Sequence, residues 1–130
     1  MVSENRELFG ITIRQETKTN MLNLSDLKEA YTHGRVLRGW SDRNITEILS
    51  SKYNSERIYH LLNEQTDVKL DFSTFTKSMS KNPARTLKSL GMYKTTGKAD
   101  NRSTWCNPYL WVLVAMEMNP ELYAKVTLQE

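Results

Sequence analysis

All three prolines of the chain directly follow an asparagine, in the pairs Asn82-Pro83, Asn107-Pro108 and Asn119-Pro120. Asparagine is a favoured residue at the N-cap of a helix. Proline is well tolerated at the first helical position, because its missing N–H has no intrahelical partner there. Each pair therefore predicts the start of a helix. The three predicted helices span Pro83–Leu90, Pro108–Met118 and Pro120–Thr127.

The sequence between the first two of these helices has the pattern of a hairpin. Gly91 is placed to end the first helix, and Met92–Thr96 and Ser103–Cys106 have the composition of short strands. The polar segment Gly97–Arg102 connects them. Asp71 is expected to cap one more helix upstream, with Phe72, Phe75 and Met79 on its buried side. Helix, turn, helix and basic hairpin is the order found in a winged helix-turn-helix.

The first half of the chain predicts a β-hairpin followed by helices. Gly10–Glu16 alternates apolar and polar residues, and Met21–Leu24 is its expected partner strand. Three further helix starts are expected, capped by Ser25, Asn44 and Ser55. The first of these helices, with Leu24, Leu27 and Tyr31 on its buried side, is expected to end at Gly34.

We therefore expect an α+β fold: a compact single domain, residues 1–130 with a core at about 9–127. It would have an N-terminal β-hairpin, several helices and a winged helix-turn-helix-like C-terminal half. A chain of 130 residues has the length of one ordinary domain, and no repeat or linker divides it. The first ten residues lack the apolar core of a signal peptide, and no apolar run approaches the roughly 18 residues of a membrane helix. With a single cysteine as well, the sequence predicts a cytoplasmic protein.

The positive charge of the chain is concentrated in one central segment. The net charge is only +3, and residues 1–64 are balanced, with nine basic and nine acidic side chains. Residues 65–102 carry eight basic and three acidic side chains, and residues 103–130 carry one and three. A basic segment on a nearly neutral chain is typical of a surface that binds a polyanion. The alternative is a solvated face whose acidic partners come from elsewhere in the fold.

Two clusters supply the candidate nucleic-acid-binding residues. The central segment contributes a helix and the hairpin. The second cluster is Arg35, Arg38 and Arg43 around Trp40, where the arginines could contact the DNA backbone or stand beside a structural tryptophan. Trp105 and Trp111 could stack on bases, but their apolar surroundings favour a place in the core. The candidate residues are Arg38, Arg43, Arg85, Lys88, Lys94, Lys98 and Arg102.

The sequence gives little support for an enzyme. His33 and His60 fit no metal-binding spacing, and Cys106 lies between Trp105 and Asn107, where a small buried side chain is expected. There is no glycine-rich phosphate loop and no Gly-x-Ser-x-Gly motif. We expect no catalytic residue, no metal and no cofactor, although the few carboxylates leave a metal-dependent nuclease open as the weakest alternative.

The C-terminal half contains a series of motifs that together are typical of one family. They are Leu90–Lys94, the basic turn, Thr104–Pro108, the apolar Leu110–Met118 and Asn119–Leu122. In this order they resemble the KilA-N domain of bacteriophages and large DNA viruses. Asn23–Leu27, Arg38–Trp40 and Asn44–Leu49 are more loosely similar to the upstream motifs of that family, so that the likeness covers roughly residues 9 to 127. In two places the chain departs from the family pattern. Asn107 stands where a histidine is usual, and Asp100 places a negative charge in the turn.

The resemblance implies an α+β DNA-binding domain related to the fungal APSES domains, with a regulatory or antirepressor-like role in a phage. If the protein is phage-encoded, its expected location is the host cell cytoplasm. Our first hypothesis is therefore a non-enzymatic protein that binds double-stranded DNA through the basic helix, the hairpin or both. The alternative is a protein-interaction module on the same scaffold that binds a host or phage regulator. A second protein or a homodimer could supply the domain that many family members carry after this one, and no membrane partner is expected.

Overall fold

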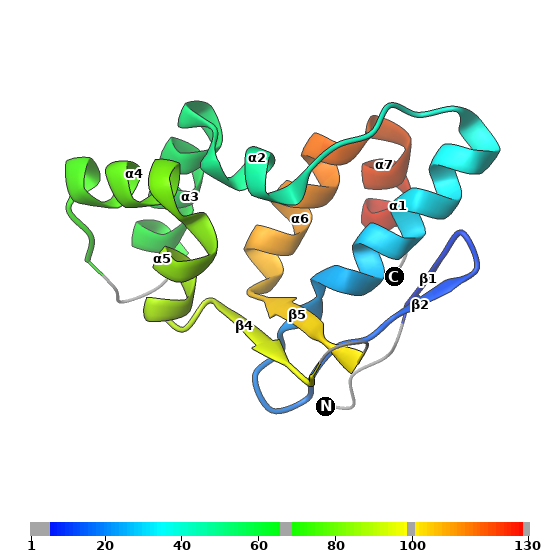
Figure 1. The fold of residues 1–130 in the computed structure, drawn as a ribbon, viewed down its shortest axis with the longest axis horizontal. Coiled ribbons are helices and arrows are strands. Elements are labelled where there is room, and N and C mark those ends of the chain that lie inside the picture. Colours follow the sequence, from blue (N-terminus) through cyan, green and yellow to red (C-terminus); the bar gives the residue numbers. More distant parts are fainter. Residues whose placement is uncertain (1–5, 66–68, 99–100, 129–130) are drawn as a thin grey trace. The chain divides into compact units, whose positions relative to one another are not determined.

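The computed structural model describes residues 6–65, 69–98 and 101–128, and it has an α+β fold (Figure 1). The described residues form seven helices and two small antiparallel sheets. They divide into two structural units. Unit 1 combines residues up to Asp42 with those from Tyr93 onward, and unit 2 is Arg43–Met92. The single domain expected from the sequence stays a prediction.

Unit 1 contains both sheets and three helices. Strands β1 and β2 form the N-terminal hairpin, and β5 lies between β3 and β4 in the second sheet. Helix α1 packs on β2 and β5, and α6 packs on α1 and α7. The elements are β1 (Arg6–Leu8), β2 (Ile11–Ile13), β3 (Leu22–Asn23), α1 (Leu24–Arg38), β4 (Tyr93–Thr96), β5 (Ser103–Cys106), α6 (Pro108–Met118) and α7 (Pro120–Leu128).

Unit 2 is entirely helical in its described residues. Its core is formed by Ile48, Ile58, Leu62, Phe75, Met79 and Leu87, which contribute at least one buried side chain from each of the four helices. Phe72, expected on the buried side, is 41% exposed and packs edge-on against Tyr59. The helices are α2 (Ile45–Ser50), α3 (Lys52–Gln65), α4 (Phe72–Lys81) and α5 (Pro83–Ser89).

The helix starts predicted from the Asn-Pro pairs are confirmed. Helices α5, α6 and α7 begin at the three prolines, and the asparagine before each one accepts hydrogen bonds from backbone N–H groups of the first turn. The caps at Asn44 and Asp71 are confirmed in the same way. Ser55 is not a cap: it lies buried inside α3, whose first turn is instead capped by the Ser51 hydroxyl. Short polar side chains before an apolar periodicity therefore marked these helix starts, except where a second polar residue nearby takes the cap position.

The N-terminal hairpin is formed by a different pair of strands from the predicted pair. Strand β2 pairs with β1, a short charged segment with no strand pattern of its own. The expected partner, Met21–Leu24, meets the predicted strand Gly10–Glu16 only beyond the end of β2, at the antiparallel bridge from Gln15 to Leu22. There the Glu16 N–H donates to Met21 O and the Asn23 N–H donates to Arg14 O. Instead, β3 pairs with β5, so that Leu22 lies opposite Cys106. A pairing between strands so far apart in the sequence leaves no local signal.

Helix α1 is longer at both ends than the sequence predicted. It begins after Asn23, whose Oδ1 accepts a hydrogen bond from the Asp26 N–H, so Ser25 is not the cap. It passes through Gly34 and ends at Gly39, which takes the left-handed conformation. Gly34 has a packing role instead: it is buried, and a Cβ there would overlap the indole ring of Trp40. That indole also stacks on Tyr31, which makes Trp40 a structural anchor.

We expect Gly34→Ala to destabilise the protein, even though alanine is the better helix former. The added methyl group would displace the Trp40 ring from its place against Tyr31, and overpacking of this kind costs about 1–3 kcal/mol. Urea unfolding followed by circular dichroism measures the change. The paired variant Gly34→Ala/Trp40→Leu removes the overlapping ring and should recover part of the loss. Equal or higher stability of Gly34→Ala alone would contradict this packing.

The core of unit 1 lies between its second sheet and α1 and α6. Leu27, Tyr31, Leu110 and Trp111 are all fully buried there. Cys106 is buried as predicted, and its burial raises the pKa of the thiol well above the ordinary range. Trp105, which was also expected in the core, is only half-buried. The two tryptophans therefore have different structural roles.

The order of elements in the C-terminal half is the predicted one, namely α4, α5, β4 and β5. The two helices belong to unit 2 and the hairpin belongs to unit 1. The winged helix-turn-helix arrangement of the two parts thus stays a prediction. No helix among the described residues is both long and apolar enough to cross a membrane.

Candidate nucleic-acid interface

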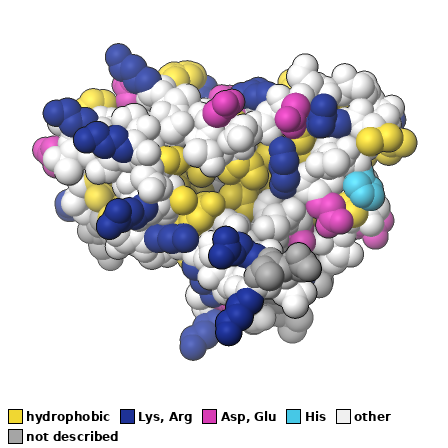
Figure 2. Space-filling view, viewed as in Figure 1, with side chains coloured by type: hydrophobic (Ala, Val, Ile, Leu, Met, Phe, Trp, Pro, Cys, Tyr) yellow, Lys and Arg dark blue, Asp and Glu magenta, His cyan; other side chains and the backbone are white. Residues whose placement is uncertain are grey.

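Helices α4 and α5 of unit 2 carry a set of exposed cations, which we call the α4–α5 basic surface. The helical spacing of these cations places two side chains on one face of α4 and two on one face of α5. Lys and Arg side chains stand out at the surface over this helix pair (Figure 2). The members of the surface are Lys77, Lys81, Arg85 and Lys88, all of them exposed.

The local sequence explains why these four side chains face solvent. Phe75 and Met79 turn the opposite face of α4 into the core of unit 2, and Pro83 and Leu87 do the same for α5. A single residue, Asn82, joins the two helices. Its N–H donates to Ser78 O at the end of α4, and its Oδ1 accepts from the Arg85 N–H at the start of α5. The shared cap fixes the backbone from which the cations project.

The α4–α5 basic surface is not neutralised within the part of the chain that the structure describes. No hydrogen bond, ion pair or ring contact there involves the side chains of its four members. The sequence from Phe72 to Met92 contains no aspartate or glutamate. Unit 2 as a whole has eight basic and five acidic residues, whereas unit 1 has ten of each. The surplus charge of the protein is therefore carried by unit 2, and largely by this surface.

Two of the predicted binding residues in unit 1 are held in ion pairs. Lys94 Nζ lies 2.7 Å from Glu16 Oε1 and 2.8 Å from Glu16 Oε2. The lysine lowers the pKa of the Glu16 carboxyl by donating hydrogen bonds to it, with help from Thr19. Arg38 Nε lies 3.0 Å from Glu121 Oε2. In both pairs the carboxylate offsets the positive charge of the lysine or arginine, which would otherwise be available to bind a phosphate.

The end of the β4–β5 hairpin presents the other two predicted cations of unit 1. Lys98 and Arg102 are exposed, and among the described residues no interaction engages either side chain. Gly97 has a positive φ of 83°, and the Asn101 carbonyl lies so close that a side chain at 97 would collide with it. Asp100, a departure from the family pattern, lies outside the described residues. The hairpin thus offers two cations where the sequence predicted three.

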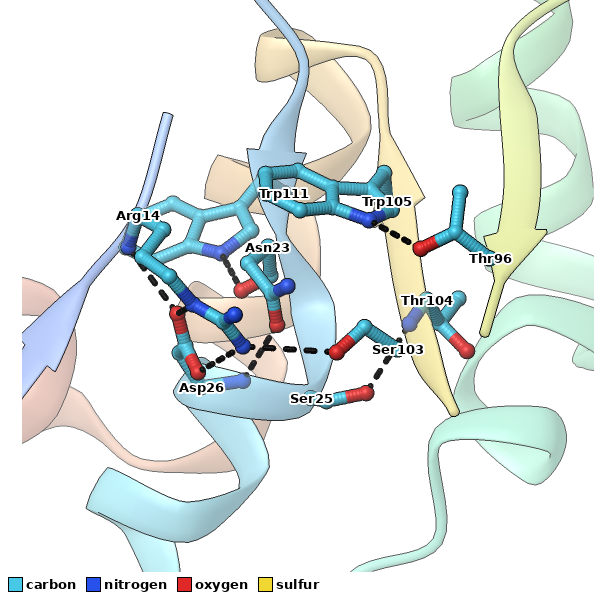
Figure 3. Close-up of polar contacts among 9 residues, drawn as sticks. All are labelled: Arg14, Asn23, Ser25, Asp26, Thr96, Ser103, Thr104, Trp105 and Trp111. Atoms are coloured by element: carbon cyan, nitrogen blue, oxygen red, sulfur yellow. Dashed lines mark hydrogen bonds and ion pairs between the residues drawn. The ribbon is translucent and has the colours of Figure 1, made fainter. Parts of the chain in front are cut away.

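Arg14 is the residue of this region that the sequence analysis missed. Its guanidinium binds the buried Asp26 carboxylate with two hydrogen bonds, of 2.9 and 3.0 Å, and its N–H donates to the same group (Figure 3). The Asp26 hydrogen bond raises the pKa of Arg14. The guanidinium also reaches Ser103 Oγ at 3.3 Å and lies 5.6 Å from the ring centre of Trp105. The one sequence signal that could have identified Arg14 was its polar position in the alternating segment Gly10–Glu16.

Trp105 occupies the outer face of the second sheet with polar neighbours. It lies opposite Lys94 in the register of β4 and β5, and its Nε1–H donates to Thr96 Oγ1 at 3.0 Å. Its half-buried ring, with Arg14 beside it, is fixed in orientation. Trp111, in contrast, donates its Nε1–H to the buried Asn23 carbonyl at 3.2 Å (Figure 3). Of the two, only Trp105 is accessible to a ligand.

The last predicted residue, Arg43, lies exposed at the start of unit 2 and has an interaction partner. Arg35, its neighbour in the cluster around Trp40, lies 3.7 Å from Asp42 and donates to the Trp40 carbonyl. The structural interpretation of the Trp40 cluster is therefore the better supported one. Within the described ranges, no three His, Cys, Asp or Glu residues come together in a way that could hold a metal ion.

Comparisons with known proteins add no relative. No family model, no curated protein and no solved structure matches the chain.

Proposed function

We propose that this protein binds double-stranded DNA without performing chemistry on it, and that the α4–α5 basic surface makes the principal contact. The observation that carries the proposal is that four exposed cations without partners among the described residues occur together on two helices joined by one residue. Duplex DNA carries one negative charge for every 1.7 Å or so of its axis, so a row of fixed cations gains several phosphate contacts at once.

Two further observations fit the same role. The resemblance to KilA-N domains supports a regulatory or antirepressor-like role in a phage. The absence of acidic side chains from Phe72 to Met92 also removes the groups that a metal-dependent nuclease would need on this surface.

A protein partner is the second candidate, because two large apolar side chains of α1 are unusually exposed. Val36 is 83% exposed and Leu37 64% exposed. A competition assay separates the two candidates. Labelled 25-base-pair duplex is bound to the protein, and unlabelled duplex or polyglutamate is added at equal charge. We expect only the unlabelled duplex to displace the label. Equal displacement by polyglutamate would favour an acidic protein as the ligand.

We expect the hairpin to supply a secondary contact that does not depend on sequence. Lys98→Ala/Arg102→Ala removes two exposed cations and should weaken binding to every duplex alike, by about fiftyfold near 100 mM salt, because each lost phosphate contact lowers the salt slope by about 0.9. The control, Lys18→Ala/Lys125→Ala, removes two exposed cations from elsewhere in unit 1. If the hairpin variant bound duplex DNA as tightly as the unmodified protein, the hairpin would be excluded from the interface.

A further inference from the structure

The arginines of this chain differ in how their guanidinium groups are occupied. Five of the seven with described side chains have a partner. Arg14 binds Asp26, Arg35 binds Asp42, Arg38 binds Glu121, Arg57 stacks on Tyr53 with 4.0 Å to the ring centre, and Arg43 has a contact of its own. Only Arg85 and Arg102 of this set are without a partner among the described residues, and of these only Arg85 belongs to the α4–α5 basic surface.

The backbone at Arg85 is firmly held. Its N–H is bound to Asn82 Oδ1 at 3.1 Å, and the hydroxyl of the next residue, Thr86, donates to the Asn82 carbonyl at 2.9 Å. Leu87, two residues on, is fully buried in the core of unit 2. The side chain of Arg85 therefore projects from a fixed point, which limits the entropy lost when it binds.

The other three members of the surface are lysines, which act on phosphates as single-point charges. A guanidinium presents two parallel N–H donors, and this fork matches the O6 and N7 acceptors of a guanine in the major groove. Given the proposed function, on which this inference rests, we propose that Arg85 is the specificity-determining residue. It would read a guanine, while Lys77, Lys81 and Lys88 contact phosphates.

The test combines selection with a single-atom change in the DNA. Duplexes bound by the unmodified protein are selected from a random pool, and the guanine that they share is replaced by 7-deazaguanine, which lacks the N7 acceptor. We expect this replacement to weaken binding about 5- to 150-fold, the discrimination of one good bidentate contact. For Arg85→Ala, which has no donor at this position, the two duplexes should bind equally. The control, Lys88→Ala, should weaken both duplexes while keeping the ratio between them.

The outcomes separate this inference from the function on which it rests. If the selected duplexes share no guanine, or if Arg85→Ala discriminates against 7-deazaguanine as strongly as the unmodified protein, the role of Arg85 is overturned while duplex binding stands. If no duplex is bound at low salt, the proposed function fails and this inference fails with it. Circular dichroism of each variant shows whether the fold is kept, which is expected because both side chains are exposed.

Discussion

Replacing all four members of the α4–α5 basic surface by alanine should lower the affinity for duplex DNA about a thousandfold near 100 mM salt. Each cation that neutralises a phosphate contributes about 0.9 to the slope of log affinity against log salt, so four together account for a slope of about 3.6. The side chains are exposed and have no partners within the described residues, so their removal should leave the fold intact. Fluorescence anisotropy with a labelled duplex measures both affinity and slope.

A variant of equal charge separates the position of these cations from their number. Lys18, Lys52, Lys69 and Lys125 are also exposed, and their replacement by alanine lowers the net charge by the same amount. We expect this control to bind within about tenfold of the unmodified protein, because general attraction between charges is screened beyond about 10 Å at this ionic strength. Equal losses in the two variants would mean that net charge, and not the α4–α5 basic surface, governs binding.

The largest effect on stability is expected at Trp111. Its side chain is fully buried in unit 1, and its Nε1–H donates to the buried Asn23 carbonyl, where β3 meets the start of α1. Trp111→Ala leaves a large cavity and a buried carbonyl without its donor, and truncations of this kind cost about 3–5 kcal/mol in free energy of unfolding. Since small domains are only about 5–15 kcal/mol stable, we expect partial unfolding at 37 °C.

Trp105→Ala is the matched comparison, because it removes the same side chain from a half-buried position on the outer face of the sheet. The free energy of unfolding should fall by only about 1 kcal/mol, because Trp105 buries less apolar surface than Trp111 does. Urea unfolding of both variants measures the difference. Similar costs for the two tryptophans would contradict the distinct roles assigned to them.

Local sequence signals predicted much of this fold. The Asn-Pro pairs, Asn44 and Asp71 mark helix starts, because a capping side chain and the first helical turn lie within three residues of each other. The hairpin strands β4 and β5 were found for a similar reason, since the turn that joins them is short. Gly34 was misread as a helix end because its reason for being glycine, the Trp40 ring, lies six residues further on.

Contacts between segments that lie far apart in the chain could not be predicted from the sequence. Lys94 looked available for phosphate, but the fold places Glu16 against it from 78 residues away, and Arg38 meets Glu121 from 83 residues away. Arg14 was not predicted as a site residue, because its partners Asp26 and Ser103 are not its neighbours in the sequence. Of the α4–α5 basic surface, the sequence analysis named Arg85 and Lys88 but missed Lys77 and Lys81. The helical spacing from Lys77 to Lys81, opposite the buried Phe75 and Met79, was the local signal for them.

The basic segment recognised in the sequence is therefore divided by the structure. Residues 65–102 cross the boundary between unit 2 and unit 1, which lies at Met92 and Tyr93. The part in unit 2 keeps its cations exposed, while Lys94 in unit 1 is paired with a carboxylate. We accordingly expect the helices to contribute more to DNA binding than the hairpin does.

Salt dependence of duplex binding by the unmodified protein tests the central claim most directly. Anisotropy of a labelled 25-base-pair duplex would be titrated at several salt concentrations between about 50 and 200 mM. With four contacts from the α4–α5 basic surface and two from the hairpin, the slope should be about −5, which corresponds to a roughly thousandfold loss of affinity over this range. No binding at 50 mM salt, or an affinity that does not change with salt, would contradict a phosphate-binding surface on this protein.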